Sequence, residues 1–173
     1  MGKIIKTDVE IEQTFIRAPN NMYTFSSKKV REWVISNCGK DTLNLYAGKT
    51  KLDINETRND VNPEMPADYH MPAFDFLRLW KGRKFDTVIL DPPYSERKAI
   101  EFYKGYRASN FNKTKDAIIN ILKPLGVVIS CGYQSVVMGK KRNFYIQKLA
   151  HISHGGAIHD TTITVERFIP DAF

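Results

Sequence analysis

Apolar side chains recur at helical spacing in three segments of the chain. In residues 28–36 they stand three and four positions apart, after two serines that can cap a helix and before Gly39, which can end one. Residues 73–80 predict a short helix, and residues 113–124 predict an amphipathic helix that ends at Pro124. Helices are therefore expected along the whole chain rather than in one part of it.

Other segments have the pattern of strands. Residues 85–90 and 127–132 are continuous apolar runs, which are typical of strands buried on both faces of a parallel sheet. The last two segments alternate apolar and polar positions and are joined through a Gly-Gly turn, which is a hairpin signal. The remaining expected strands, including the two of the hairpin, are residues 42–48, 56–61, 144–153 and 161–168.

Strand, helix and strand alternate along the chain, and a hairpin ends it. This order predicts an α/β fold with an open, mostly parallel sheet and a C-terminal antiparallel hairpin. The first 25 residues have a mixed pattern and are interpreted as an N-terminal extension. The whole of residues 1–173 is expected to form one domain, because no repeat or interdomain linker is visible.

The composition is that of a globular domain, with 42% hydrophobic and 26% charged residues among 173. No run approaches the roughly 18 apolar residues that a membrane span needs, and the first residues lack the apolar core of a signal peptide. We expect a soluble, cytoplasmic protein. Cys38 and Cys131 are interpreted as core residues and His151, His154 and His159 as strand and turn residues, so no metal site is expected.

The net charge of the chain is +7. A basic surface favours a polyanionic partner, because binding to phosphates releases condensed counterions. The same charge also occurs on solvated surfaces that bind nothing. The charge therefore indicates a nucleic-acid partner only if a suitable site lies beside it.

The residues Asp91, Pro92, Pro93 and Tyr94 follow the apolar strand 85–90 directly, at the carboxyl end where open α/β sheets bind ligands. The two prolines restrict the backbone, so the Pro92 carbonyl is held in a defined direction beside the Asp91 carboxylate. Both groups accept hydrogen bonds, which suits an NH₂ group, and Tyr94 offers a face for a planar base. Two acceptors would favour tetrahedral geometry at a conjugated amine and stabilise the positive charge that develops as it attacks a methyl sulfonium.

This tetrapeptide in this position resembles the catalytic motif of the amino methyltransferases of nucleic acids. These include adenine and cytosine methyltransferases of DNA and RNA and guanine exocyclic-amine methyltransferases of RNA. The resemblance covers about residues 20–168. The order of motifs in this chain is similar to that of small archaeal proteins described as adenine-specific methylases. It implies a Rossmann-like class I methyltransferase fold, S-adenosylmethionine as cofactor, and catalytic roles for the four residues. A strand-ending turn without function is the alternative.

The resemblance also implies a cofactor-binding segment after the first strand of the family fold. There a glycine lets the backbone approach the methionine part of the cofactor. This sequence departs from the family pattern, because an acidic residue is common where Asn44 stands and further glycines are common where Lys49 and Thr50 stand. The residues that the resemblance assigns to this segment are Leu45, Tyr46, Ala47 and Gly48.

The same segment has a second interpretation. Gly48, Lys49 and Thr50 match the end of a Walker A loop, which would bind nucleotide phosphates. That motif requires a glycine five residues before Gly48, where Leu43 stands. The nucleotide-phosphate interpretation is therefore excluded.

By the same resemblance, the second and third strands of the family fold contribute the nucleoside site. The Asp60 carboxylate would bind two ribose hydroxyls, and Val61 would pack on the adenine ring. The third strand is expected to end at residues 70–72, where Pro72 replaces an acidic residue that often contacts adenine. A main-chain contact near Met71 would then take its place.

Basic and aromatic residues alternate in the segment that follows Tyr94. Cations suit phosphates and aromatic rings suit unstacked bases, so the segment fits a splayed or flipped nucleotide; a helix with its aromatic residues in the core fits equally well. A second basic run follows the apolar strand 127–132 and is expected at the rim of the same site. The residues assigned to nucleic-acid binding are Arg97, Lys98, Lys104, Arg107, Lys140, Lys141 and Arg142.

No segment is long enough for the separate target-recognition domain that sequence-specific DNA methyltransferases carry. We therefore expect methylation of adenine or cytosine in structured RNA such as rRNA, recognised by shape, slightly ahead of DNA with a short site. Two alternatives stay open. One is methylation of a protein glutamine amide, and the other is a noncatalytic RNA-binding module that has lost its cofactor.

Overall fold

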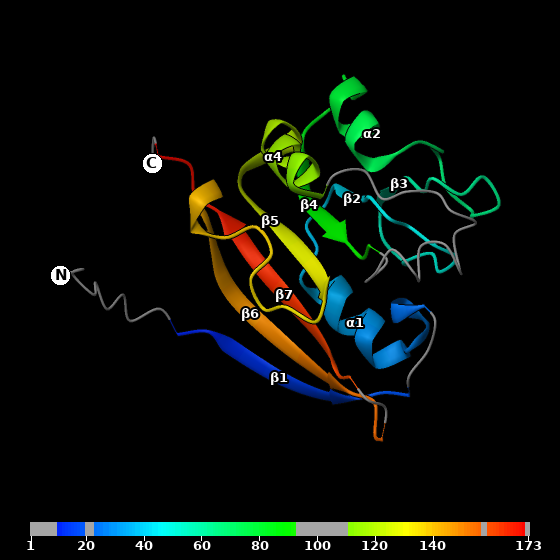
Figure 1. Ribbon diagram of the computed structural model, residues 1–173, viewed down its shortest axis with the longest axis vertical. Coiled ribbons are helices and arrows are strands. Elements are labelled where there is room, and N and C mark those ends of the chain that lie inside the picture. The colour runs from blue at the N-terminus through cyan, green and yellow to red at the C-terminus, as the bar shows by residue number, and fades with distance from the viewer. Residues whose placement is uncertain (1–9, 20–22, 93–110, 157–158, 172–173) are drawn as a thin grey trace.

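A computed structural model describes residues 10–19, 23–92, 111–156 and 159–171. The described residues form a seven-stranded sheet in the order β1-β6-β7-β5-β4-β2-β3 (Figure 1). Neighbouring strands are parallel except β7, which runs antiparallel to both β5 and β6. The predicted α/β fold with a C-terminal antiparallel hairpin is confirmed. The strands are β1 Glu12–Arg17, β2 Thr42–Asn44, β3 Glu56–Arg58, β4 Phe85–Leu90, β5 Leu122–Gly132, β6 Phe144–Ser153 and β7 Thr161–Phe168.

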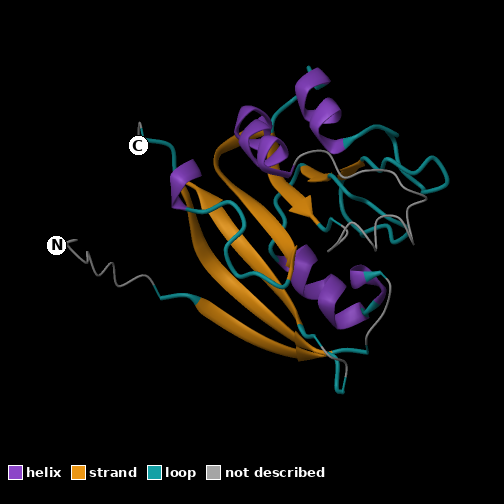
Figure 2. Ribbon diagram, viewed as in Figure 1, coloured by secondary structure: helices purple, strands orange, loops and turns teal. Residues whose placement is uncertain are grey.

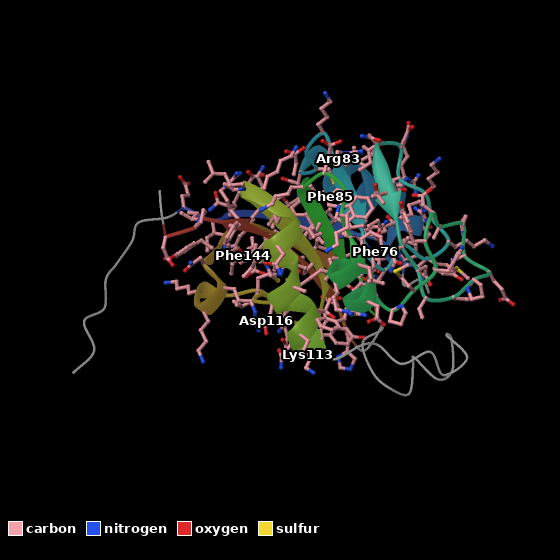
Figure 3. All side chains as sticks on the ribbon, turned by 90° about the horizontal axis from the view of Figure 1, so that it is seen from above. Phe76, Arg83, Phe85, Lys113, Asp116 and Phe144 are labelled. Carbon is pink, nitrogen blue, oxygen red and sulfur yellow. The ribbon has the colours of Figure 1, made fainter. Side chains whose placement is uncertain are left out.

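Helices cover both faces of the sheet (Figure 2). Along β4, Val88 and Leu90 pack in one apolar cluster with residues of α2 and α4, whereas Ile89 packs in another with residues of α1. Figure 3 shows Phe76, Phe85 and Phe144, which belong to the first cluster. A strand buried on both faces explains the continuous apolar run in β4. The helical elements are η1 Thr24–Ser26, α1 Lys28–Ser36, α2 Ala73–Leu79, α4 Phe111–Ile121 and η2 Lys140–Arg142.

The first helix matches its predicted bounds, but its ends are held differently from the prediction. Ser27 occupies the N-cap position without a side-chain capping hydrogen bond, and the helix ends at Ser36 with Asn37 as its C-cap. Gly39 has another role, because a Cβ atom there would lie 2.4 Å from the Cβ of Asp86. Glycine thus permits the close approach of the chain to the start of β4.

The predicted end of α4 at Pro124 is wrong by one turn of helix. The helix ends at Ile121, and β5 begins at the next residue, so Pro124 lies inside the irregular first part of that strand. There Leu125 has a φ of 61°, and the pairing with β4 shifts register between Phe85 and Thr87. Proline cannot donate to the ladder, and a bulge of this kind accommodates it.

The N-terminal segment contributes an edge strand that the sequence pattern did not predict. β1 pairs parallel with β6, from Glu12 opposite Lys148 to Arg17 opposite Ser153. Most residues of β1 are polar, and its apolar Phe15 is 79% exposed beside the half-buried Ile16. The sequence of β1 therefore lacks the apolar–polar alternation that marks a half-buried strand. Among the helices of the described ranges, none is long and apolar enough to cross a membrane.

Candidate active site

The carboxyl ends of β2, β3 and β4 meet at one edge of the sheet. These strands are parallel neighbours, with Asn44 opposite both Arg58 and Ile89. The chain after each strand stays in contact with its neighbours. The Leu45 N–H donates to the Ile89 carbonyl at 3.1 Å, and the Ala47 N–H donates to the Asn59 carbonyl at 2.9 Å. The residues that follow three different strands are therefore brought together.

The predicted cofactor segment, Leu45 to Gly48, makes a turn at this edge. Leu45 and Ala47 are buried, whereas Tyr46 and Gly48 are half-buried. Gly48 has a φ of 56°, a left-handed conformation that glycine adopts without steric cost. The predicted glycine thus stands where the backbone requires one.

Asp60 closes this turn with its carboxylate. One oxygen accepts the Gly48 N–H at 2.8 Å, and the other accepts the Asn62 N–H at 2.9 Å. The residue is only 4% exposed. A carboxylate has about four acceptor directions, so each oxygen keeps one for a further donor. The contacts in the structure assign Asp60 first to the shape of the turn.

At the place of the predicted third strand, the described residues form a parallel bridge between Asn59 and Tyr69 rather than a full strand. The Tyr69 N–H donates to the Arg58 carbonyl at 3.1 Å, and the Asp60 N–H donates to the Tyr69 carbonyl at 3.0 Å. α2 begins at Ala73. Instead of a strand, the buried Asn59 side chain donates to the carbonyls of Leu45 and Met71, at 3.2 and 3.0 Å. Met71 is therefore still held beside the turn, and both Met71 and Val61 are half-buried.

Asp91 and Pro92 follow β4 directly at the same edge and are half-buried. Burial, with a smaller contribution from the charge of Asp91, raises the pKa of the Cys131 thiol well above its ordinary value. Burial also raises the pKa of Cys38 to about 12. Neither thiol is a nucleophile at neutral pH, which agrees with their predicted place in the core. Pro93 and Tyr94 lie outside the described residues.

Two residues at this edge were missed by the sequence analysis. The side chains of Arg58 and Glu56 are 4% and 0% exposed and form an ion pair of 2.6 Å. They stand two positions apart in β3 and therefore point to the same side of the strand. Opposite charges at this spacing, in a segment expected to be a strand, were the available signal.

The expected place of Lys140, Lys141 and Arg142 is wrong. β6 is parallel to β5, so the chain after β5 returns across the sheet and η2 lies at the amino edge, away from Asp91 (Figure 1). There Arg142 pairs with Asp116 of α4 at 2.6 Å. Desolvation, followed by the charge of Arg142, lowers the pKa of the neighbouring Lys115. The other four predicted cations, Arg97, Lys98, Lys104 and Arg107, lie outside the described residues.

The late histidines have structural contacts. The two ring nitrogens of His154 lie 3.0 Å from the Ala18 carbonyl and 2.9 Å from the Thr161 hydroxyl. His151 stacks on Phe15, and His159 packs against Tyr133. In the described part of the chain, no three His, Cys, Asp or Glu side chains are grouped as a metal site would require.

No family model and no curated protein matches the sequence. Solved structures do match the fold. The N-methyltransferase NodS from Bradyrhizobium japonicum is 12% identical, with a TM-score of 0.57 over 83% of this chain and 96% of that one. The 1,6-didemethyltoxoflavin-N1-methyltransferase from Burkholderia thailandensis, which holds S-adenosylhomocysteine, is 11% identical, with a TM-score of 0.53 over 82% and 76%. TrmN from Thermus thermophilus is 12% identical, with a TM-score of 0.52 over 80% of this chain and 46% of that one. The chain has the Rossmann-like fold of the class I methyltransferases.

Proposed function

We propose that this protein is an S-adenosylmethionine-dependent N-methyltransferase that methylates the exocyclic amine of adenine or cytosine in nucleic acid. One observation supports it most. Asp91 and Pro92 lie at the carboxyl end of β4, at the same edge as the turn that Gly48 and Asp60 form on the strands beside it. The proposed acceptors of the amine and the proposed cofactor-binding turn thus follow adjacent strands, β4 and β2, as methyl transfer between two bound molecules needs.

The residues at this edge fit the proposed cofactor. Asp60 keeps acceptor capacity for ribose hydroxyls, and the half-buried Val61 and Met71 offer apolar surface for an adenine ring. The segment from Leu45 to Gly48 would hold the amino-acid part through its main chain, because a glycine turn leaves no Cβ in the way. When bound, this cofactor supplies the methyl group as a sulfonium.

The chain's own residues would act on the amine. The Asp91 carboxylate and the Pro92 carbonyl would accept its two hydrogens and orient its lone pair, and Tyr94, with Pro93 before it, would support the base. The nitrogen would gain the methyl group as the bond between that group and the sulfonium sulfur breaks, and the proton that it releases would pass to solvent. The two acceptors would stabilise the positive charge that develops on the nitrogen. Placing the base against Asp91 requires that it leave its stack.

The net charge of +7 supports a polyanionic substrate. Arg97, Lys98, Lys104 and Arg107 follow the catalytic tetrapeptide and would bind phosphates near the base. Lys140, Lys141 and Arg142 lie at the far edge of the sheet, so they would contact a substrate only if it extends around the protein. Structured RNA, which proteins recognise largely by shape, fits such separated cations better than a short DNA site does.

Transfer of a labelled methyl group into total RNA, DNA and protein tests this function. We expect label in nucleic acid, foremost in RNA, and loss of about 100-fold or more in Asp91→Asn, with S-adenosylhomocysteine still bound. Asp75→Asn is the matched control, because Asp75 is an exposed carboxylate of α2 and should leave transfer unchanged. Label in protein alone, or undiminished transfer by Asp91→Asn, would overturn the proposal.

A further inference from the structure

Every N–H group of the Arg58 guanidinium has a hydrogen-bond acceptor. Its Nε donates to the Pro66 carbonyl at 2.7 Å, and its Nη1 donates to Thr50 and Glu56 at 3.0 and 2.6 Å. Its Nη2 donates to the carbonyls of Ala47 and Gly48 at 3.2 and 2.9 Å. An arginine has five N–H donors, and all of them have an acceptor here.

These contacts hold the main chain of the turn from the side of β3. The Ala47 N–H and carbonyl are bonded to Asn59 and Arg58, and the Gly48 N–H and carbonyl are bonded to Asp60 and Arg58. Arg58, Asn59 and Asp60, which are consecutive at the end of β3, therefore bind the main-chain N–H and carbonyl groups of the turn at residues 47 and 48. The conformation of the turn depends on this strand end more than on its own sequence.

Glu56 keeps Arg58 in place and explains one departure from the family pattern. Its Oε1 accepts both Arg58 and the Leu52 N–H, the latter at 2.8 Å, and its Oε2 accepts the Asn44 amide at 3.1 Å. An acidic residue at position 44 would place a second buried carboxylate against Glu56, and two like charges at this distance repel. Asparagine supplies a donor instead.

The other departure has the same explanation. Lys49 and Thr50 stand where the resemblance leads one to expect glycines, and Thr50 offers its carbonyl to Arg58. A segment with few glycines has fewer backbone conformations available for a turn. The Arg58 side chain binds three carbonyls of this segment and can thereby stabilise the turn that further glycines would otherwise allow.

We infer that Arg58, held by Glu56, is the positioning residue that sets the cofactor-binding turn at residues 47–50. Arg58 does not contact the cofactor and acts through the main chain of that turn. The inference rests on the proposed function for the identity of the ligand. It assigns a role in cofactor binding to a charged pair inside a strand of three residues.

Arg58→Lys tests this role, because lysine keeps the charge but has only three donors for five acceptors. The affinity for S-adenosylhomocysteine, measured by titration calorimetry, should fall about tenfold or more, and KM for the cofactor should rise with little change in kcat. Arg83→Lys is the matched control, since Arg83 also donates to a carboxylate, that of Asp41 at 3.0 Å, near the amino ends of β2 and β4. It should leave both quantities unchanged.

A second measurement separates this role from the proposed function. Exchange of the Ala47 and Gly48 amide hydrogens should be faster in Arg58→Lys and unchanged in Arg83→Lys, with or without ligand. A folded Arg58→Lys protein with wild-type affinity and wild-type exchange would overturn the inference. If the wild-type protein bound no S-adenosylhomocysteine, the proposed function would fail, and the exchange rates alone would decide whether Arg58 holds the turn.

Discussion

The two ends of the sheet are stabilised in different ways. The C-terminal hairpin consists of β6 and β7, with ten and eight residues. Its ladder pairs Phe144 with Phe168 at one end and Ile152 with Thr161 at the other, with one register shift between Ile146 and Lys148. The opposite end consists of β2 and β3, with three residues each, which provide few ladder hydrogen bonds. There a buried polar network replaces length, so this end tolerates less change in its side chains.

A buried glutamate illustrates the difference at each end. Glu56 faces the cation Arg58, whereas Glu166 of β7 accepts only main-chain N–H groups, from Val137, Met138 and Gly139 at 2.9 to 3.1 Å. Both carboxylates are satisfied, but only Glu56 leaves a buried charge behind when it is removed. The short-strand end is therefore expected to be the more fragile of the two.

Removing one partner of the buried pair should have the largest effect. Glu56→Leu leaves the Arg58 guanidinium buried without its counterion and should lower the free energy of unfolding by about 3–5 kcal/mol, measured by urea denaturation. The double variant Glu56→Leu with Arg58→Met removes both charges and should recover more than half of that loss. A loss below about 1 kcal/mol in the single variant would show that the pair does not hold this end.

Three of the longer elements, unlike α4 and β5, have the bounds that the sequence pattern predicts. α1 and both hairpin strands match their expected ranges, because each has a repeating apolar face that meets the core. β1 was missed because an edge strand pairs on one side and carries polar residues. β3 was expected, and the opposite charges of Glu56 and Arg58 indicate a pair, but a strand of three residues does not show that this pair points inward.

The sequence predicted one part of the candidate site and not another. Gly48, Asp60 and Asp91 were expected at strand ends, and the parallel order of β3, β2 and β4 brings those ends to one edge. The sequence analysis predicted Lys140 at the wrong edge of the sheet, and the direction of β6 explains why. A strand that runs parallel to β5 must begin at the amino edge, so the segment before β6 cannot stay beside Asp91.

Weakening the other buried carboxylate should have a smaller and local effect. Glu166→Gln keeps one acceptor oxygen and replaces the other with an amide that cannot accept, so some of the three N–H groups lose their partner. We expect a loss of about 1–3 kcal/mol in unfolding free energy and faster amide exchange at residues 137–139. The affinity for S-adenosylhomocysteine should not change, because Glu166 lies on β7, and β5 and β4 separate β7 from β2 and the turn that follows it. A large loss of affinity would contradict the independence of the two ends.

The smallest effect is expected at the half-buried ion pair between Asp86 and Lys123, whose charged atoms lie 2.9 Å apart at the starts of β4 and β5. Burial pushes the pKa of Asp86 upward, but hydrogen bonds from Lys123 and from the Asp41 N–H, with nearby positive charges, outweigh it and lower the pKa. A carboxylate whose pKa is lower in the folded state binds protons more weakly there than in the unfolded chain. Its contribution to stability is therefore present above the unfolded pKa and is lost as the pH falls through the folded one.

Asp86→Asn should consequently lower Tm by roughly 3 °C or less at pH 7, because solvent still reaches both side chains and screens the pair. The difference between wild type and variant should hold from about pH 5 upward and vanish in acid, below the lowered pKa of Asp86. Lys123 also contacts Asp41 at 3.3 Å, so the variant keeps one of its two ion pairs. A Tm difference that persists at about pH 2 would mean that Asp86 acts through its hydrogen bonds rather than its charge. The Asp86–Lys123 pair would then resemble the Glu56–Arg58 pair, whose contribution to stability depends on hydrogen-bond geometry as well as on charge.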